Sequence, residues 1–546
     1  MPSSPLAGKT APESSLIDVP ALLAAFHGEH PDPALPAQGV SFGTSGHRGS
    51  AFKRTFNEDH IVAIAHAICD YRAANGTDGP LYIGRDTHAV SEPATRVACE
   101  CLAARGVDVR IADGDGYTPT PVVSHAVIAA NRGRSAHRAD GIVVTPSHNP
   151  PEDGGFKYDP PHGGPADTDV TVTIESRANE LLRAGVAKLA RIPYERALRE
   201  GRVRTHDFAT PYIADLATAI DCDAIARSGV RLGADPMGGA SVGYWGRIAE
   251  KYGLNLEVVR TTVDPTFRFI PLDHDGKIRT DCSSPYAMAN LLAIRERFDL
   301  SFGNDADADR HGVVSRAGGL LPPNHFLAVC ADYLFGRRGW PERASLGKTV
   351  VSSSILDRVA RLHGRALVEV PVGFKWFVSG LADGSIGFAG EESAGASLVR
   401  KDASVWTTDK DGLVLNLLAA EILAVAKRDP AAYYTGLETQ LGAASFYTRL
   451  DEPATVAQRA RIKAVKPEDV HETTLAGEPI TARLLNAPGN GAAIGGLKVV
   501  SEQGWYALRP SGTEDIYKLY AESLRDRAHL DAIVAQARAT VARVLA

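Results

Sequence analysis

The chain of 546 residues is too long for one compact core, so we expect about three to five domains. Hydrophobic residues make up 44% of it, charged residues make up 23%, and the net charge is -6, as in ordinary globular proteins. No basic excess is present to attract nucleic acid. Since there is no run of about 18 apolar residues and no signal-like start, we predict a cytoplasmic protein without a membrane partner.

A polar leader, residues 1–40, precedes a region that alternates strand-like and helix-like segments. The strand-like segments are "PLYIGRD", "VDVRIAD" and "GIVVTPS", and the helix between the first two is expected to begin with Ser91 as its N-cap. Cys99 and Cys101 lie in a segment where Ala94, Val97, Ala98, Cys101 and Leu102 have the spacing of a buried helix face, so we expect the cysteine pair to belong to the core and not to bind a metal. This alternation of strand-like and helix-like segments predicts an α/β domain over residues 41–207.

Two more α/β units follow, and a segment of different composition closes the chain. Residues 208–322 contain "RLGADPMGG" and "RFDLSFGNDADADRHGVVS", and residues 323–440 contain "KTVVSSSI" and the helix-like "KDGLVLNLLAAEILAVAKR". Near residue 440 the composition changes: the segment through "PATVAQRARIKAVKPEDVHETT" is charged, and "GWYALRPSGTEDIYKLYAES" has the pattern of two strands joined by a loop. We therefore expect a smaller α+β domain over residues 441–546.

The first motifs in chain order are a glycine-rich loop and a serine in a stiff turn. "GTSGHRG" lets the backbone approach a ligand and adds the multi-donor cation Arg48. In "TPSHNP", Ser147 follows an apolar strand but lacks the G-x-S-x-G elbow of acyl transfer. A phosphorylated serine and a turn-forming serine both remain open. Lys157 can be a proton carrier, an anion contact or a surface residue.

The acidic loop "GNDADADRHG" carries the most specific signal. Asp305, Asp307 and Asp309 alternate after an apolar strand, so their carboxylates can converge, with strong repulsion unless a cation is present. Oxygen ligands without His or Cys suit Mg2+ better than zinc. An EF-hand is excluded, because its sixth and twelfth positions would be Arg310 and Arg316. The remaining alternative is a solvated acidic turn, although Arg310 favours a site that also handles anions.

Two later loops have the chemistry to bind a sugar and a phosphate. "GEESAG" supplies Glu391, Glu392 and Ser393, which suit sugar hydroxyls, although a solvated acidic turn is the alternative. "RPSGTE" combines Arg509 with two hydroxyls and a glycine turn whose amides could hold a phosphate.

Taken together and in this order, these motifs resemble those of the α-D-phosphohexomutase superfamily, over most of the chain from about residue 43 to residue 521. The resemblance implies an α/β fold of four domains around a central cleft: three related α/β domains with mixed sheets, then a smaller α+β domain. It implies an isomerase that reversibly interconverts α-D-glucose 1-phosphate and glucose 6-phosphate. The phosphoserine enzyme would act through glucose 1,6-bisphosphate, which also serves as activator.

The resemblance also assigns roles to single residues. It implies that Ser147 carries the phosphoryl group and that Mg2+ is bound by Ser147, Asp305, Asp307 and Asp309. Arg48, Lys157 and Arg310 would surround the phosphoryl group; we expect Lys157 to be the general base if its neighbours lower its pKa, with His148 as the fallback. The residues implied to bind the substrate are Lys375, Glu391, Ser393, Arg509, Ser511, Gly512 and Thr513.

Substrate range is less securely implied. Glutamine or methionine in place of Glu392 is usual in relatives that act on glucosamine or mannose phosphates, and those relatives often have histidine where Ala396 stands. Phosphomannomutase or other phosphohexomutase specificity, a phosphatase, and a catalytically inactive metal-binding protein remain alternatives. The expected partners are small sugar phosphates, with the chain as a monomer or small homo-oligomer and the C-terminal domain as a lid.

Overall fold

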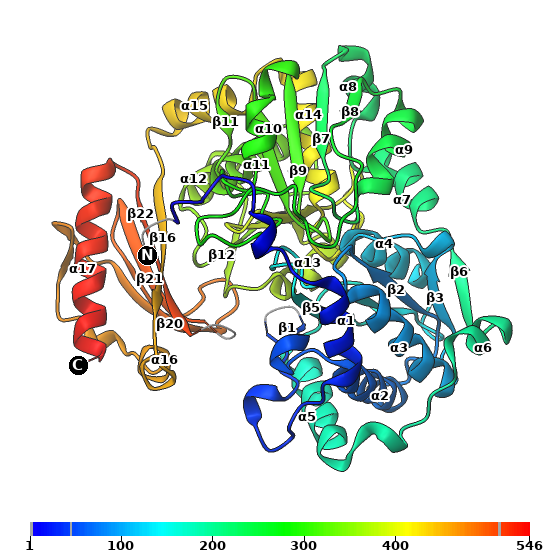
Figure 1. Ribbon diagram of the computed structural model, residues 1–546. Coiled ribbons are helices and arrows are strands. Elements are labelled where there is room, and N and C mark those ends of the chain that lie inside the picture. The colour runs from blue at the N-terminus through cyan, green and yellow to red at the C-terminus, as the bar shows by residue number, and fades with distance from the viewer. Residues whose placement is uncertain (1–3, 44–45, 512–514, 546) are drawn as a thin grey trace.

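The computed structural model describes residues 4–43, 46–511 and 515–545. Within these residues the chain forms four main sheets, which define domains I to IV in chain order (Figure 1). Domains I to III have mixed sheets with helices, and domain IV has an antiparallel sheet, which confirms the expected fold class. None of the helices in the described part of the chain has the length and apolar character needed to cross a membrane.

Domain I is built on a six-stranded sheet of order β1-β5-β4-β2-β3-β6. Strands β4, β2, β3 and β6 are parallel, and β5 runs antiparallel to β4 and β1. The elements are α1 Val19–Gly28, β1 His47–Ser50, α2 Glu58–Ala74, β2 Leu81–Arg85, α3 Ser91–Ala104, β3 Val109–Ala112, α4 Thr120–Asn131, β4 Asp140–Val144, β5 Asp153–Asp159, α5 Thr168–Ala184, α6 Tyr194–Arg199 and β6 Val203–His206.

Domains II and III repeat this plan with smaller sheets, of order β11-β10-β9-β7-β8 and β13-β12-β14-β15. Domain II contains α7 Ala209–Asp215, α8 Cys222–Ser228, β7 Leu232–Asp235, α9 Val242–Tyr252, β8 Leu256–Val258, α10 Ala289–Ala293, β9 Leu300–Asn304, β10 His311–Ser315 and β11 Gly319–Leu320. Domain III contains α11 Pro323–Arg337, β12 Ser345–Thr349, α12 Ile355–Leu362, β13 Leu367–Val370, α13 Val378–Asp383, β14 Ile386–Glu391, β15 Gly395–Leu398, α14 Gly412–Ala426 and α15 Pro430–Leu441.

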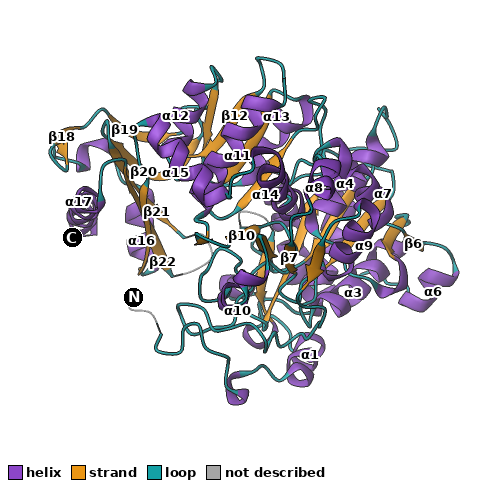
Figure 2. Cartoon of the chain, turned by 90° about the horizontal axis from the view of Figure 1, so that it is seen from above, coloured by secondary structure: helices purple, strands orange, loops and turns teal. Residues whose placement is uncertain are grey.

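Domain IV has a five-stranded antiparallel sheet, and α17 packs against its strands β21 and β22 (Figures 1 and 2). The elements are β16 Phe446–Pro453, α16 Val456–Lys463, β17 Thr474–Leu475, β18 Glu478–Pro479, β19 Ala482–Asn486, β20 Ala493–Val500, β21 Gly504–Pro510, β22 Ile516–Ser523 and α17 Arg527–Leu545. The two strands expected around "RPSGTE" are therefore confirmed as β21 and β22.

Each domain places its motif in the loop of an antiparallel strand pair. Ser147 lies between β4 and β5 and the three aspartates between β9 and β10, while Glu391 ends β14 and residues 392–394 connect it to β15. Arg509 and Pro510 of "RPSGTE" end β21, and Ser511 directly follows them. The repeated hairpin is thus the structural reason why four separated motifs are presented in equivalent ways.

The leader packs against the folded domains. In α1, Leu22 and Phe26 are both 0% exposed and belong to the core of domain I. Nearer the start, the Ser4 amide donates to the His274 carbonyl at 2.7 Å and the Gly8 amide to the Leu272 carbonyl at 2.7 Å. The leader therefore spans from domain II to domain I.

One helix start differs from expectation. Helix α3 begins with Ser91 inside its first turn, and Val90 occupies the N-cap position. The Ser91 hydroxyl instead donates to Asp86 Oδ1 at 2.6 Å. The prediction of a Ser91 N-cap was wrong because a buried carboxylate takes its hydroxyl. Cys99 and Cys101 are both 0% exposed, as expected for the core.

Candidate active site

Ser147 lies at the junction of domains I and II. Its side chain is buried, and its hydroxyl donates to Asp305 Oδ2 at 2.8 Å. Its backbone has a φ of 59°, in the left-handed region that residues with a Cβ rarely adopt. A serine in an ordinary surface turn would not be buried against an acidic loop of another domain, so the geometry favours a functional serine.

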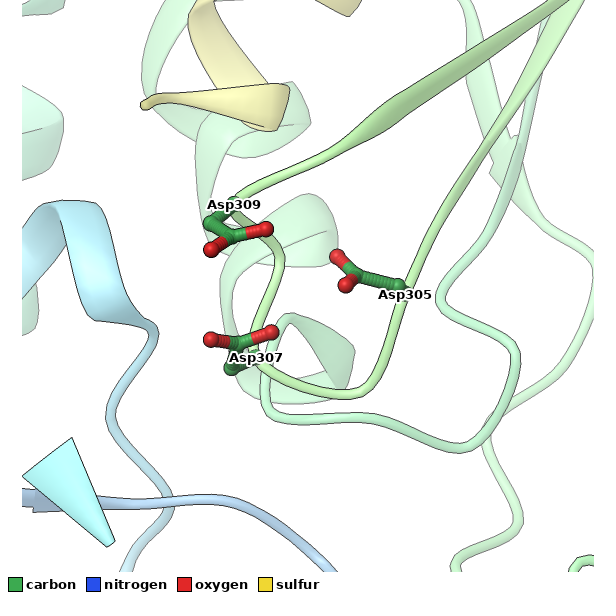
Figure 3. A group of neighbouring side chains, drawn as sticks. All are labelled: Asp305, Asp307 and Asp309. Carbon is green, nitrogen blue, oxygen red and sulfur yellow. The ribbon is translucent and has the colours of Figure 1, made fainter. Parts of the chain in front are cut away.

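The three aspartates of the metal loop, residues 305–309, point toward one another (Figure 3). Each has a carboxylate oxygen within 4.8 Å of those of the other two, and all three residues are at most 1% exposed. The alternative of a solvated acidic turn is therefore wrong.

Backbone hydrogen bonds from domains I and III fix this loop. The Thr120 amide of domain I donates to the Asp307 carbonyl at 2.9 Å, and the Gly412 amide of domain III donates to the Ala308 carbonyl at 3.0 Å. A Cβ on Gly412 would lie 2.0 Å from the Arg310 carbonyl oxygen, so only glycine allows this approach. Domains I, II and III therefore all contribute to one site.

The residues of the metal loop fit a hard divalent cation. Asp307 Oδ1 and Asp309 Oδ1 are buried and have no hydrogen-bond partner among the described residues. Burial and the nearby carboxylates of Asp307 and Asp309 raise the pKa of Asp305 well above its ordinary value. A metal cofactor bound by carboxylate oxygens would satisfy the unpaired atoms and offset the repulsion.

Lys157, on β5, reaches this cluster and is 4% exposed, so the surface interpretation is wrong. Its Nζ donates to Asp307 Oδ2 at 2.6 Å and to Asp309 Oδ2 at 3.3 Å. Burial alone would lower the pKa of Lys157, but Asp307 and Asp309 outweigh burial and raise it. The condition set for its role as general base, a pKa lowered by its neighbours, is therefore not met while these carboxylates carry their full charge.

His148, Arg48 and Arg310 surround the same serine. His148 Nδ1 lies 3.4 Å from the Ser147 hydroxyl, and burial followed by the Arg310 charge lowers the pKa of His148 well below its ordinary value. Arg310 Nε lies 3.8 Å from both Asp305 Oδ2 and Asp309 Oδ1. Arg48, opposite Gly155 in the β1–β5 pair, donates to Asn149 Oδ1 at 3.3 Å.

The sugar loop of domain III meets the segment that carries Lys375. The Gly373 amide donates to Glu391 Oε1 at 3.0 Å, which holds the two segments together. Burial raises the pKa of Glu391 to about 7, against the opposing charge of Lys410. Lys375 donates to the Thr168 hydroxyl of domain I, and Ser393 is half-buried.

The C-terminal loop is described only in part. Arg509 Nε donates to the Ile494 carbonyl at 3.1 Å, and the Ser511 amide donates to the Ile516 carbonyl at 2.9 Å. Gly512 and Thr513 lie outside the described residues. Burial raises the pKa of Tyr520, an effect that Glu392 of the sugar loop increases and Arg509 opposes. The charges of Glu392 and Arg509 thus act in opposite directions on the same buried tyrosine.

Three residues at the site were missed by the sequence analysis. Lys410 Nζ lies 2.9 Å from Asp309 Oδ2, the Thr120 hydroxyl donates to Asp307 Oδ2 at 2.6 Å, and the Asp281 charge opposes the lowering of the His148 pKa. The one usable signal was "DKD", three charged residues directly before the apolar helix α14.

Comparison with known proteins places the whole chain in one family. It matches four descriptions, "Phosphoglucomutase/phosphomannomutase, alpha/beta/alpha" domains I, II and III and "C-terminal domain", over residues 39–184, 210–318, 322–440 and 447–540. The chain belongs to the phosphoglucomutase/phosphomannomutase family. Within this family it is 56% identical to the phosphoglucomutase of Komagataeibacter xylinus, over 100% of this chain and 99% of that protein.

A more distant sequence and a solved structure also resemble this chain. The phosphoglucosamine mutase of Pelotomaculum thermopropionicum is 26% identical over 89% of this chain and 95% of its own. The crystal structure of parafusin, a phosphoglucomutase from Paramecium, matches with a TM-score of 0.72 at 19% identity, covering 94% of this chain and 96% of that one. This structural likeness shows the fold.

Proposed function

We propose that this enzyme is a phosphoglucomutase that interconverts α-D-glucose 1-phosphate and glucose 6-phosphate. The observation that carries the proposal is the 2.8 Å hydrogen bond from the Ser147 hydroxyl to Asp305 Oδ2, which joins a serine nucleophile to a buried carboxylate cluster. The 56% identical phosphoglucomutase of K. xylinus, matched over the whole chain, supports glucose phosphates as substrates.

We propose that Ser147, Asp305, Asp307 and Asp309 hold Mg2+, which when bound neutralises charge on the phosphoryl group. Phosphorylated Ser147 gives its phosphoryl group to a hydroxyl of the sugar phosphate; the new bond joins that oxygen to phosphorus, and the bond to Ser147 Oγ breaks. Lys157 takes the hydroxyl proton. The pKa of Lys157 is raised by the charges of Asp307 and Asp309, so a cation held by those carboxylates would lower it toward the range of a base.

The product of this first transfer is glucose 1,6-bisphosphate, which we propose turns over and returns its other phosphate to Ser147. Arg48 and Arg310 balance the charge at Ser147, with His148 as the alternative proton acceptor. Contacts to the sugar and to the phosphate that is not reacting are proposed for Lys375, Glu391, Ser393, Arg509, Ser511, Gly512 and Thr513.

Several predictions from the sequence accompany this proposal. We propose domain limits of 41–207, 208–322, 323–440 and 441–546 after the leader. The cytoplasmic location, the small homo-oligomer or monomer, and the absence of nucleic-acid and membrane partners stay predictions.

A coupled assay tests the proposed function. Glucose 1-phosphate, Mg2+ and a trace of glucose 1,6-bisphosphate should give glucose 6-phosphate, and mannose 1-phosphate and glucosamine 1-phosphate should react more slowly. Release of inorganic phosphate without glucose 6-phosphate would identify a phosphatase and contradict the proposal.

A further inference from the structure

A buried hydrogen-bond network lies beneath the loop that carries Ser147. Its centre is Asp86, which is 1% exposed and directly follows β2. The Asp86 carboxylate accepts from the Thr145 hydroxyl at 2.6 Å, the Ser91 hydroxyl at 2.6 Å and His88 Nδ1 at 2.8 Å. Strands β2 and β4 are parallel neighbours, with Arg85 opposite Val144, so both loops leave the sheet at the same edge.

Two branches of this network reach the backbone on either side of the Ser147 side chain. Through one, the Thr145 hydroxyl accepts from the Ser147 amide at 2.8 Å. Through the other, His88 Nε2 lies 3.1 Å from the Asn149 carbonyl oxygen. Because a carboxylate and a carbonyl can only accept, both ring nitrogens of His88 donate, and His88 is an imidazolium paired with Asp86.

The network has a clear mechanical consequence for the nucleophile. The left-handed backbone of Ser147 is unfavourable for a residue with a Cβ and needs surrounding contacts to hold it. The same backbone directs the hydroxyl to Asp305 Oδ2. The loop that carries Ser147 is buried and is hydrogen-bonded on both sides of this residue. The groups that hold it are Asp86, His88 and Thr145, none of which is among the residues expected to bind the substrate or the metal.

We propose that Asp86, His88 and Thr145 are positioning residues for phosphoryl transfer, which fix the Ser147 backbone so that its oxygen faces the metal loop. This inference rests on the proposed function. The expected signature is a loss of kcat with little change in substrate or metal affinity, since the hydrogen bonds of these residues reach neither the groups proposed to bind the substrate nor the three aspartates.

The test compares two substitutions of one hydroxyl. Thr145→Val keeps the shape but removes both hydrogen bonds, and it should lower kcat by about 10- to 100-fold with KM for glucose 1-phosphate and Mg2+ affinity within about twofold. Thr145→Ser keeps the hydroxyl and should remain within about threefold of the wild-type kcat. Asp86→Asn, which weakens the same network from its centre, should lower kcat in the same way and serves if the valine variant does not fold.

Asp140→Asn is the matched control, because Asp140 begins β4, the strand that leads to this loop, and is buried with Arg72 and Tyr158. It should lower Tm while leaving kcat within about twofold. Wild-type kcat in both Thr145→Val and Asp86→Asn would overturn the positioning role, as would equal kcat losses in Thr145→Ser and Thr145→Val. A wild-type enzyme that neither isomerises glucose 1-phosphate nor gains a phosphoryl group from glucose 1,6-bisphosphate would overturn the proposed function and this inference with it.

Discussion

The two ends of the site differ in how completely the fold prepares them. At the reaction end, Ser147, Asp305, Asp307 and Asp309 are 0–1% exposed and have fixed partners from other domains. At the substrate end, Lys375, Ser393 and Arg509 are only half-buried. The charges proposed to stabilise transfer are thus preorganised, while these three residues proposed to bind the substrate are more exposed, although Glu391 and Ser511 of the same proposed set are buried. Changes at the first end should mainly lower kcat, and changes at the second should mainly raise KM.

The largest effect is expected from Asp307→Asn. The substitution removes a charged ligand of the metal loop and the closest partner of Lys157, so kcat should fall by at least about 10^3-fold and Mg2+ affinity should fall with it. Steady-state kinetics measure kcat, and isothermal titration calorimetry measures the affinity for Mg2+. Asp299→Asn, just before β9 and paired with Arg231, should change neither. Near-normal kcat in Asp307→Asn would place the reaction elsewhere.

Lys157→Met separates proton transfer from metal binding. We expect kcat to fall by about 10^2-fold or more, because the attacking hydroxyl loses its proton acceptor. Mg2+ affinity should not weaken, since Lys157 Nζ competes for Asp307 Oδ2 at 2.6 Å. Lys157→Arg keeps the charge but cannot act as a base. If it restored kcat, Lys157 would act only through its charge.

Arg509→Ala probes the substrate end. Losing a charge-assisted contact to the distal phosphate should raise KM for glucose 1-phosphate by about 10- to 100-fold with a smaller change in kcat. Ser147 should still accept a phosphoryl group. Arg538→Ala, on α17 and paired with Glu452, is the control. An unchanged KM in Arg509→Ala would remove this loop from the substrate end.

The smallest effect is a pH dependence of KM from Glu391. Its pKa is raised to about 7, so it is mostly protonated at pH 6 and ionised at pH 8. The carboxylate accepts from sugar hydroxyls and the protonated acid does so less well, so KM should fall by up to about tenfold as pH rises across this range. In Glu391→Gln, the pH dependence of KM should reflect only the titration of the substrate's phosphate group. The same pH profile in both enzymes would show that Glu391 does not control binding.

The candidate loops could be located from the sequence because each is a short polar motif at the end of an apolar strand. The hairpins then place "TPSHNP", "DADAD" and "GEES" at equivalent turns. The local sequence pattern of an apolar strand followed by a polar motif is enough to predict this placement. The metal loop was the clearest case, since three alternating carboxylates that converge after a buried strand repel one another strongly unless a cation is bound.

What the sequence could not indicate depends on contacts between distant segments. Lys410 was not predicted as a site residue, because its position against Asp309 follows from the packing of α14 against β9 and β10. The Ser91 hydroxyl was assigned to a helix cap because its partner Asp86 is visible only in the folded domain. The direction of the Lys157 pKa shift likewise required knowing that two carboxylates of another domain lie against it.

The most direct test of the central claim is the intact mass of the purified protein before and after incubation with glucose 1,6-bisphosphate and Mg2+. We predict a species heavier by about 80 Da, with the phosphoryl group mapped to Ser147 and lost on reaction with glucose 1-phosphate. Ser147→Ala should show neither this species nor mutase activity. A Ser147→Ala enzyme that keeps the added mass or converts glucose 1-phosphate to glucose 6-phosphate would contradict the account.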